Sequence, residues 1–171
     1  MINWPDEDDD PIELVIEDDR WLDADLAALT HRAAGVVAEW LEIDDLRIVV
    51  MGCDDARIAA LNAEFRGRAV PTNVLSWPTQ DFAPRDPGAT PEAPPSPELG
   101  DIAISYDTCL REAEAQSKPF PHHVVHLLVH AVLHLAGYDH INDADAHAME
   151  HAEREILNMM DIPDPYSEYE R

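Results

Sequence analysis

The chain has 171 residues, of which 46% are hydrophobic and 27% are charged, and this composition is ordinary for one soluble globular domain. Its 36 acidic and 11 basic residues give a net charge of −25, which should repel nucleic acid at long range. No apolar run approaches the roughly 20 residues of a membrane-spanning helix, and the acidic first ten residues do not resemble a signal peptide. The two cysteines follow no disulfide or Cys-x-x-Cys pattern. We therefore expect a cytoplasmic protein without a membrane partner.

The first half of the chain alternates short strands with amphipathic helices. Alternating and β-branched residues predict strands, and apolar residues that recur every three to four positions predict helices. The strands are expected at residues 12–17, 46–51 and 72–77. The helices are expected at residues 21–41 and, after a cap at Asp54 or Asp55, up to Phe65.

The second half begins with a proline-rich segment at residues 79–99, in which six of 21 residues are proline. This segment has little apolar surface to bury, so we expect a mobile loop. A strand at 99–105 follows, and then three helices at about residues 107–116, 121–136 and 144–160. Asp107 is expected to cap the first of these helices, Pro121 suits the first turn of the second, and Gly137 suits the position after its end.

Four strands and about five helices predict one α+β domain in which helices cover a small sheet. We expect this domain at residues 11–162, between a flexible acidic N-terminus at 1–10 and a C-terminal tail at 163–171. Residues 1–20 hold nine acidic residues and one basic residue, a net charge of −8, and residues 141–171 hold nine and two, a net charge of −7, so most of the excess charge lies near the two ends. Solubility in a high-salt or acid-tolerant lineage explains this charge, and shielding of a nucleic-acid site from wrong partners is the alternative.

Histidine is concentrated in one region, because eight of the nine lie between His122 and His151. Within it, His130 and His134 are four residues apart on the expected helix, so both can reach one metal ion. The glycine at 137 lets the chain fold back and brings His140 close to them. Three neutral imidazoles with an open position for water are the catalytic arrangement of zinc. We therefore predict a metal site formed by His130, His134 and His140.

The other histidines of this region are interpreted as structural. Three precede the predicted ligands on the same helix, with no turn behind them that would add a ligand: His122, His123 and His126. Two lie on the last helix, in what we expect to be a solvated face with acidic neighbours: His147 and His151, among Glu150, Glu153 and Glu155.

The same histidine spacing occurs in metzincin proteases, whose pattern is H-E-x-x-H-x-x-G-x-x-H. Their glutamate is the general base that activates a metal-bound water, and Ala131 stands at that position here. This difference argues against peptide hydrolysis. A metal ion still lowers the pKa of a bound water towards neutrality without the glutamate.

The string HAVLHLAGYDH at residues 130–140 resembles the signature of the YbeY family, bacterial endoribonucleases that mature ribosomal RNA. Upstream blocks are similar to those of the family, in the same order. They are LNAEFRG at 61–67, PTNVLSWP at 71–78 and LGDIAIS at 99–105. The family usually has glycine where this chain has Ala131, a small-for-small change that should leave the metal site intact. The loop at 79–99 is longer and richer in proline than is usual.

This resemblance implies a single zincin-like domain with a small mixed four-stranded sheet, which uses one zinc ion to cut single-stranded RNA. It gives Arg66 a functional role, since a forked guanidinium can grip a phosphate and the charge that grows on a phosphorane. An ion pair at the end of its helix is the structural alternative for Arg66. Asp139 is a candidate for orienting a histidine ligand. Arg68 is a further candidate for contact with the RNA backbone.

The implied function is maturation of the 3′ end of 16S rRNA and ribosome quality control. Ribosomal RNA and the small ribosomal subunit would be its partners, with ribosomal or assembly proteins as further ones. One rival is a metal-dependent hydrolase of another substrate, chiefly a peptide, and a second is a non-catalytic assembly factor with a structural zinc. A structural zinc normally has four protein ligands, and the three evident here favour a catalytic site. Three imidazoles also suit nickel or copper.

Overall fold

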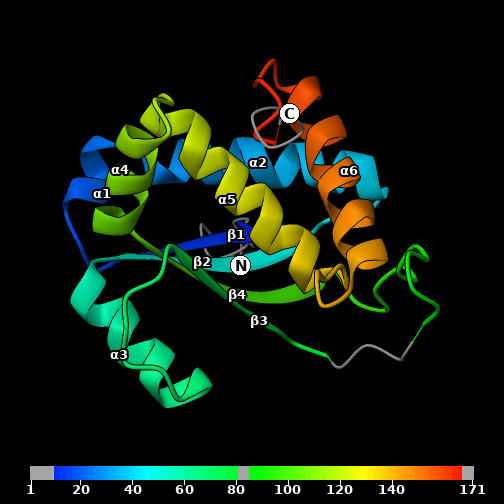
Figure 1. Cartoon of the computed structure of the whole chain (residues 1–171), viewed down its shortest axis with the longest axis horizontal. Helices are drawn as coiled ribbons and strands as arrows, with labels where there is room; N and C mark the ends of the chain where they lie inside the picture. The colour runs from blue at the N-terminus through cyan, green and yellow to red at the C-terminus, as the bar shows by residue number, and fades with distance from the viewer. Residues whose placement is uncertain (1–9, 81–84, 167–171) are drawn as a thin grey trace, which may run out of the picture.

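The computed structural model describes residues 10–80 and 85–166, which form one four-stranded sheet and six helices (Figure 1). The strands are β1 (Ile12–Ile16), β2 (Arg47–Cys53), β3 (Val74–Pro78) and β4 (Glu98–Ser105). The helices are α1 (Arg20–Asp23), α2 (Leu26–Leu41), α3 (Asp55–Arg66), α4 (Tyr106–Ala115), α5 (Phe120–Leu135) and α6 (Asp143–Met159). No helix of these residues is long and apolar enough to cross a membrane. Most of the expected flexible N-terminus, four loop residues and the last five residues of the expected tail lie outside the described part.

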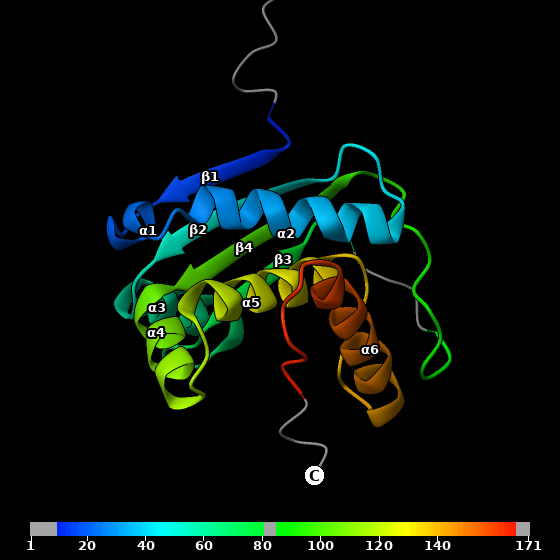
Figure 2. The same cartoon turned by 90° about the horizontal axis from the view of Figure 1, so that it is seen from above.

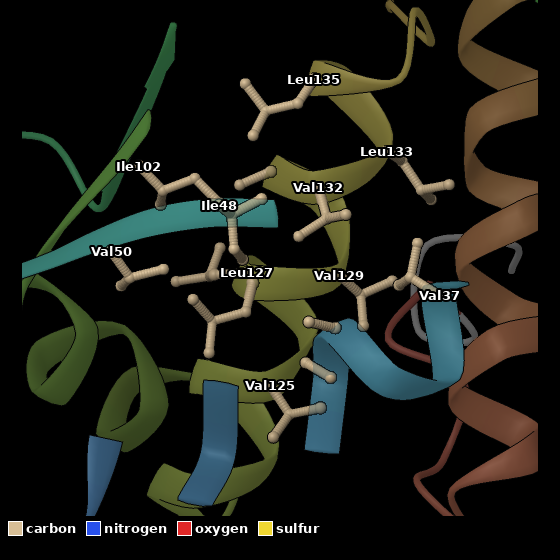
Figure 3. Close-up of a cluster of buried hydrophobic side chains, with 14 of the residues drawn as sticks. Val37, Ile48, Val50, Ile102, Val125, Leu127, Val129, Val132, Leu133 and Leu135 are labelled. Carbon is tan, nitrogen blue, oxygen red and sulfur yellow. The ribbon is translucent and has the colours of Figure 1, made fainter. Parts of the chain in front are cut away.

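The sheet has the strand order β1-β2-β4-β3, with β1, β2 and β4 parallel and β3 antiparallel to β4. This confirms the expected mixed four-stranded sheet. Neighbouring residues of a strand point to opposite faces, so each face has its own apolar set. Ile48, Val50 and Ile102 belong to the large core under the helices (Figure 3). Leu75 and Ala103 belong to a smaller core with α3, which lies on the other side of the sheet (Figure 1).

Helix α5 is the centre of the large core and packs against the sheet, α2, α4 and α6 (Figure 2). Ten of its 16 residues are buried, as expected for a helix that is apolar on most sides. As predicted, Pro121 lies in its first turn. Gly137 follows its C-cap with φ of 109°, in the range that favours glycine, and so directs the chain into the next turn.

The expected single helix at 21–41 is two helices, and Asp25 is the reason. Its backbone is left-handed, with φ of 55°, a conformation that aspartate tolerates better than most residues. Its side chain accepts a hydrogen bond from the N–H of Ala28 and thereby caps α2. The apolar periodicity continues across this break, which is why the pattern alone does not reveal it.

The expected cap at Asp107 is also wrong, because Ser105 stands at the N-cap of α4 and Asp107 lies in its first turn. The carboxylate of Asp107 has other partners. It accepts hydrogen bonds from the side chain of Arg20, at 2.7 Å, and from the backbone N–H of Asp55, at 3.0 Å. It therefore links the starts of α1, α3 and α4.

The described part of the proline-rich loop contacts the start of α6. The N–H of Gly88 donates to the Asp145 carboxylate at 2.8 Å, and the Arg85 guanidinium lies 3.9 Å from Asp139 and 4.0 Å from Asp145. Asp145 also accepts from the side chain of Asn142. The mobility of the loop stays a prediction.

Candidate metal-binding and phosphate-binding cleft

A cleft of about 520 Å³ lies where α5, the turn after it and β3 meet. All five site residues that the sequence predicted line this cleft: Arg66, His130, His134, Asp139 and His140. Its wall also includes His126 from α5 and Tyr166 from the C-terminal segment. Residues that are 100 positions apart in the sequence thus share one open surface.

The turn at Gly137 brings the third predicted ligand back to the helix. The rings of His130 and His140 have centroids 5.6 Å apart and are tilted by 32°. The Nδ1 of His134 donates to the backbone carbonyl of Tyr138 at 3.0 Å, within the same turn. The proximity that the spacing predicted is therefore present between the helix and the segment that follows it.

The hydrogen bonds of His130 and His134 show which ring nitrogen of each histidine is already bonded within the chain. His130 uses Nδ1 towards the carboxylate of Glu153, and His134 uses Nδ1 towards the carbonyl of Tyr138. Each ring therefore keeps Nε2 for another partner. Burial lowers the pKa of His134, and the nearby charges of His130, His140 and Arg66 lower it further, so its neutral form is favoured.

Neutral imidazoles with Nδ1 already bound are the donors that zinc prefers, so the chemistry of these side chains fits the ion. The described residues contain no group of three or more His, Cys, Asp or Glu side chains that could hold a metal ion as they stand. The ligand set of His130, His134 and His140 thus stays a prediction.

Glu153 was wrongly expected on a solvated face, because its side chain is only 1% exposed. Its carboxylate accepts hydrogen bonds from His126 Nε2 at 2.8 Å and from His130 Nδ1 at 3.3 Å. The sequence does contain the signal for this burial. Glu153 falls into the spacing of the buried residues Met149, Ala152 and Ile156, which form the inward face of α6.

Arg66 ends α3, where Gly67 adopts the left-handed conformation with φ of 70°. Its guanidinium donates from Nη2 to the backbone carbonyl of Ser76 on β3, at 3.1 Å. The structural alternative for Arg66 was an ion pair at the end of its helix, and the partner observed here is a backbone carbonyl instead. A guanidinium has five N–H donors, so one bond to a carbonyl leaves donors for an anion in the cleft.

Asp139 lies in the cleft and has contacts away from the histidines. Its carboxylate accepts from the N–H of Ile141 at 3.4 Å and faces Arg85 at 3.9 Å. Within the described residues it has no hydrogen bond to a histidine, and its orienting role stays a prediction. Asn73, which also lines the cleft, bonds through its side chain to Glu112 and to the N–H of Val74.

The remaining histidines follow two patterns. His123 is buried and its Nε2 bonds to Glu112 at 2.9 Å, as expected for a structural histidine. His151 forms an exposed ion pair with Glu155, as expected for a solvated face. His126 is the exception among the first three histidines of α5, because it lines the cleft and contacts Glu153.

Comparison with known proteins identifies similar chains over nearly the whole sequence. A family model described as Endoribonuclease YbeY matches residues 15–161. The protein named Endoribonuclease YbeY from Paracoccus denitrificans is 67% identical over 166 residues, covering 97% of this chain and 95% of that protein. The one from Cereibacter sphaeroides is 52% identical, covering 91% and 98%. The solution structure of TM1509 from Thermotoga maritima has a similar fold, with a TM-score of 0.53 at 22% identity over 90% of this chain and 97% of that one.

Proposed function

The chain belongs to the YbeY family of endoribonucleases, and from this membership we propose that it is a metal-dependent endoribonuclease of ribosomal RNA processing. The observation that carries the proposal is one cleft that is lined by the three histidines predicted as ligands and by Arg66. Imidazoles suit a metal ion, and a guanidinium suits a phosphate. Together these two groups suit hydrolysis of a phosphodiester.

We assign His130, His134 and His140 as the ligands of one zinc ion. Such an ion, when bound, lowers the pKa of a coordinated water and polarises a phosphoryl oxygen. The chain's part is to supply neutral nitrogen donors on a rigid helix and its following turn. Burial keeps His134 neutral, and the hydrogen bonds to Glu153 and to Tyr138 fix the two helix rings.

Arg66 acts on the substrate in this proposal. It is placed in the cleft by the end of α3 and by the Ser76 carbonyl, and its positive charge helps to lower the pKa of His134. From there its free donors bind a non-bridging oxygen of the scissile phosphate and hold the negative charge that grows as the bond breaks. Ala131 offers no carboxylate at the position of the metzincin base, so this site supports phosphodiester rather than peptide chemistry.

Single-stranded RNA at the 3′ end of 16S rRNA is the proposed substrate, met on the small ribosomal subunit in the cytoplasm. A net charge of −25 opposes binding of naked RNA, so a ribosomal or assembly protein that docks the chain would supply part of the affinity. Few phosphate contacts also mean a shallow dependence of RNA binding on salt.

The test is RNA cleavage by variants of Arg66, with metal content measured in the same samples. Arg66→Ala should lose chelator-sensitive cleavage of single-stranded RNA while keeping metal and fold. Arg66→Lys should restore cleavage poorly, since the forked donor geometry is missing. Arg57→Ala is the matched control, because Arg57 lies on the same helix and pairs with Glu17 outside the cleft.

Casein serves as the competing substrate. Metal-dependent cleavage of casein that survives Arg66→Ala would favour the protease over the ribonuclease. Full metal content with no cleavage of RNA, either free or on small-subunit particles, would favour the non-catalytic assembly factor.

A further inference from the structure

Glu153 is a buried carboxylate on which hydrogen bonds from three side chains of two other segments converge. His126 Nε2 and His130 Nδ1 of α5 reach its Oε1 at 2.8 and 3.3 Å. The hydroxyl of Tyr166, in the C-terminal segment, lies 3.0 and 3.1 Å from its two oxygens. The side chain of Glu153 is only 1% exposed, and the three donors that converge on its two oxygens mark it as a hydrogen-bond acceptor.

These contacts have a direction, because an ionised carboxylate only accepts hydrogen bonds. The Nδ1 of His130 must therefore carry a proton to bond with Glu153. In a neutral ring this leaves the lone pair on Nε2, the nitrogen that remains for a metal ion. The contact thus fixes both the tautomer of His130 and the rotation of its ring.

We propose that Glu153 is a positioning residue that presents His130 Nε2 as a metal ligand, and that His126 and Tyr166 hold Glu153 in place. The proposal rests on the metal site of the proposed function. Carboxylates that bind the second nitrogen of a histidine ligand orient the ring and make it a stronger donor. Glu153 also places a negative charge in contact with a ligand set that is otherwise neutral.

The neighbouring ligand supports this interpretation. His134 also has its Nδ1 bound, but to a backbone carbonyl, which no substitution of a side chain can remove. For His130 the same function is assigned to a side chain that costs free energy to bury. The three donors around Glu153 offset that cost, and two of them, His126 and Tyr166, are themselves residues of the cleft wall.

The experiment measures zinc affinity of the metal-free chain by competition with a chromophoric chelator. We expect Glu153→Gln to bind zinc about 10- to 100-fold more weakly than the unchanged chain, the range found when such supporting groups are replaced. Glu155→Gln is the matched control, because Glu155 is an exposed glutamate on the same helix that pairs with His151. It should bind zinc like the unchanged chain.

A second measurement does not depend on zinc. Long-range ¹H–¹⁵N spectra of the metal-free chain should show His130 as the Nδ1–H tautomer, and a mixture of tautomers in Glu153→Gln. Should Glu153→Gln fail to fold, Tyr166→Phe decides, since it removes only one hydroxyl and should weaken zinc binding several-fold. A folded Glu153→Gln, or in its absence a Tyr166→Phe, that binds zinc as tightly as the unchanged chain would overturn the inference.

The result separates the inference from the proposed function. Tight zinc binding by the unchanged chain, its loss in His130→Ala and full affinity in Glu153→Gln would refute only the role of Glu153. An unchanged chain that binds no zinc would refute the metal site, and with it this inference.

Discussion

His123 and His130, two histidines of helix α5 that each bond to a carboxylate, differ in what surrounds the second ring nitrogen. His123 bonds through Nε2 to Glu112, its ring is 4% exposed, and its buried Nδ1 has no hydrogen-bond partner among the described residues. His130 bonds through Nδ1 to Glu153, and its ring is 27% exposed in the cleft. The same kind of pair therefore serves packing at one end of the helix and presents a donor to a cleft at the other. The two histidines therefore differ in the surroundings of the ring nitrogen that does not bond to the carboxylate, and not in the bond to the carboxylate itself.

The largest expected effect separates the two histidines by metal content. His130→Ala should lose stoichiometric zinc, because one of three nitrogen donors is gone. Its melting temperature should fall as well, since a metal present at 100 times its Kd adds about 2.7 kcal/mol to stability. His123→Ala should keep its zinc and lose about 1–3 kcal/mol of stability, because removing a buried ring leaves a cavity. Metal analysis and thermal unfolding check both, and stoichiometric zinc in His130→Ala would contradict the assignment.

A smaller effect is expected in the pH dependence of the metal-free chain. Burial lowers the pKa of His123 below 6.5, against the opposing effect of Glu112, and His126 and Lys118 lower it further. Between about pH 7.5 and 5.5 the unfolded chain therefore takes up more protons at this residue than the native chain, and stability falls as the pH falls. His123→Gln should show a shallower fall in urea unfolding across this range. Equal slopes for the two chains would show that His123 titrates alike in both states.

The smallest effect on stability is expected from a change in the proline-rich loop, which contains no residue of either histidine–carboxylate pair. Replacing residues 84–97 by a short Gly/Ser linker removes the contacts of Arg85 and Gly88 with α6. Loop-closure entropy changes slowly with length, and the carboxylate of Asp145 becomes accessible to water once the loop is gone, so unfolding should shift by about 1 kcal/mol or less. A large fall in melting temperature would show that this loop packs as part of the core.

The fold and the presence of three histidines in one cleft were predictable because each rests on a local pattern. Apolar periodicity located the four strands and α5, and Gly137 located the turn that returns His140. The break at Asp25 was not predictable from periodicity, because it depends on one backbone angle within a continuous apolar pattern. The cap of α4 was mistaken because Asp107 has distant partners on α1 and α3.

Glu153 shows why part of the site escaped the sequence. A glutamate among acidic neighbours is usually solvated, and its burial here depends on donors from α5 and from Tyr166, 13 residues further on. The periodicity of α6 places it on the inward face, but only the packing of three segments shows what it meets there. The position of Glu153 on the inward face of α6 could thus be predicted from the sequence, whereas its hydrogen-bond partners could not.

If Arg66 binds a phosphate as proposed, its hydrogen bond to Ser76 affects how fast and at what free-energy cost that phosphate is bound. β3 is the edge of the sheet, and a side chain held by one of its carbonyls has already given up much of its rotamer freedom. A phosphate that enters the cleft therefore meets a preorganised guanidinium. If it must draw the arginine away from Ser76, the penalty is one hydrogen bond of about 0.5–1.5 kcal/mol, or about tenfold in affinity at most. The Ser76 carbonyl on β3 thus holds Arg66 in one position, and breaking this contact costs little free energy.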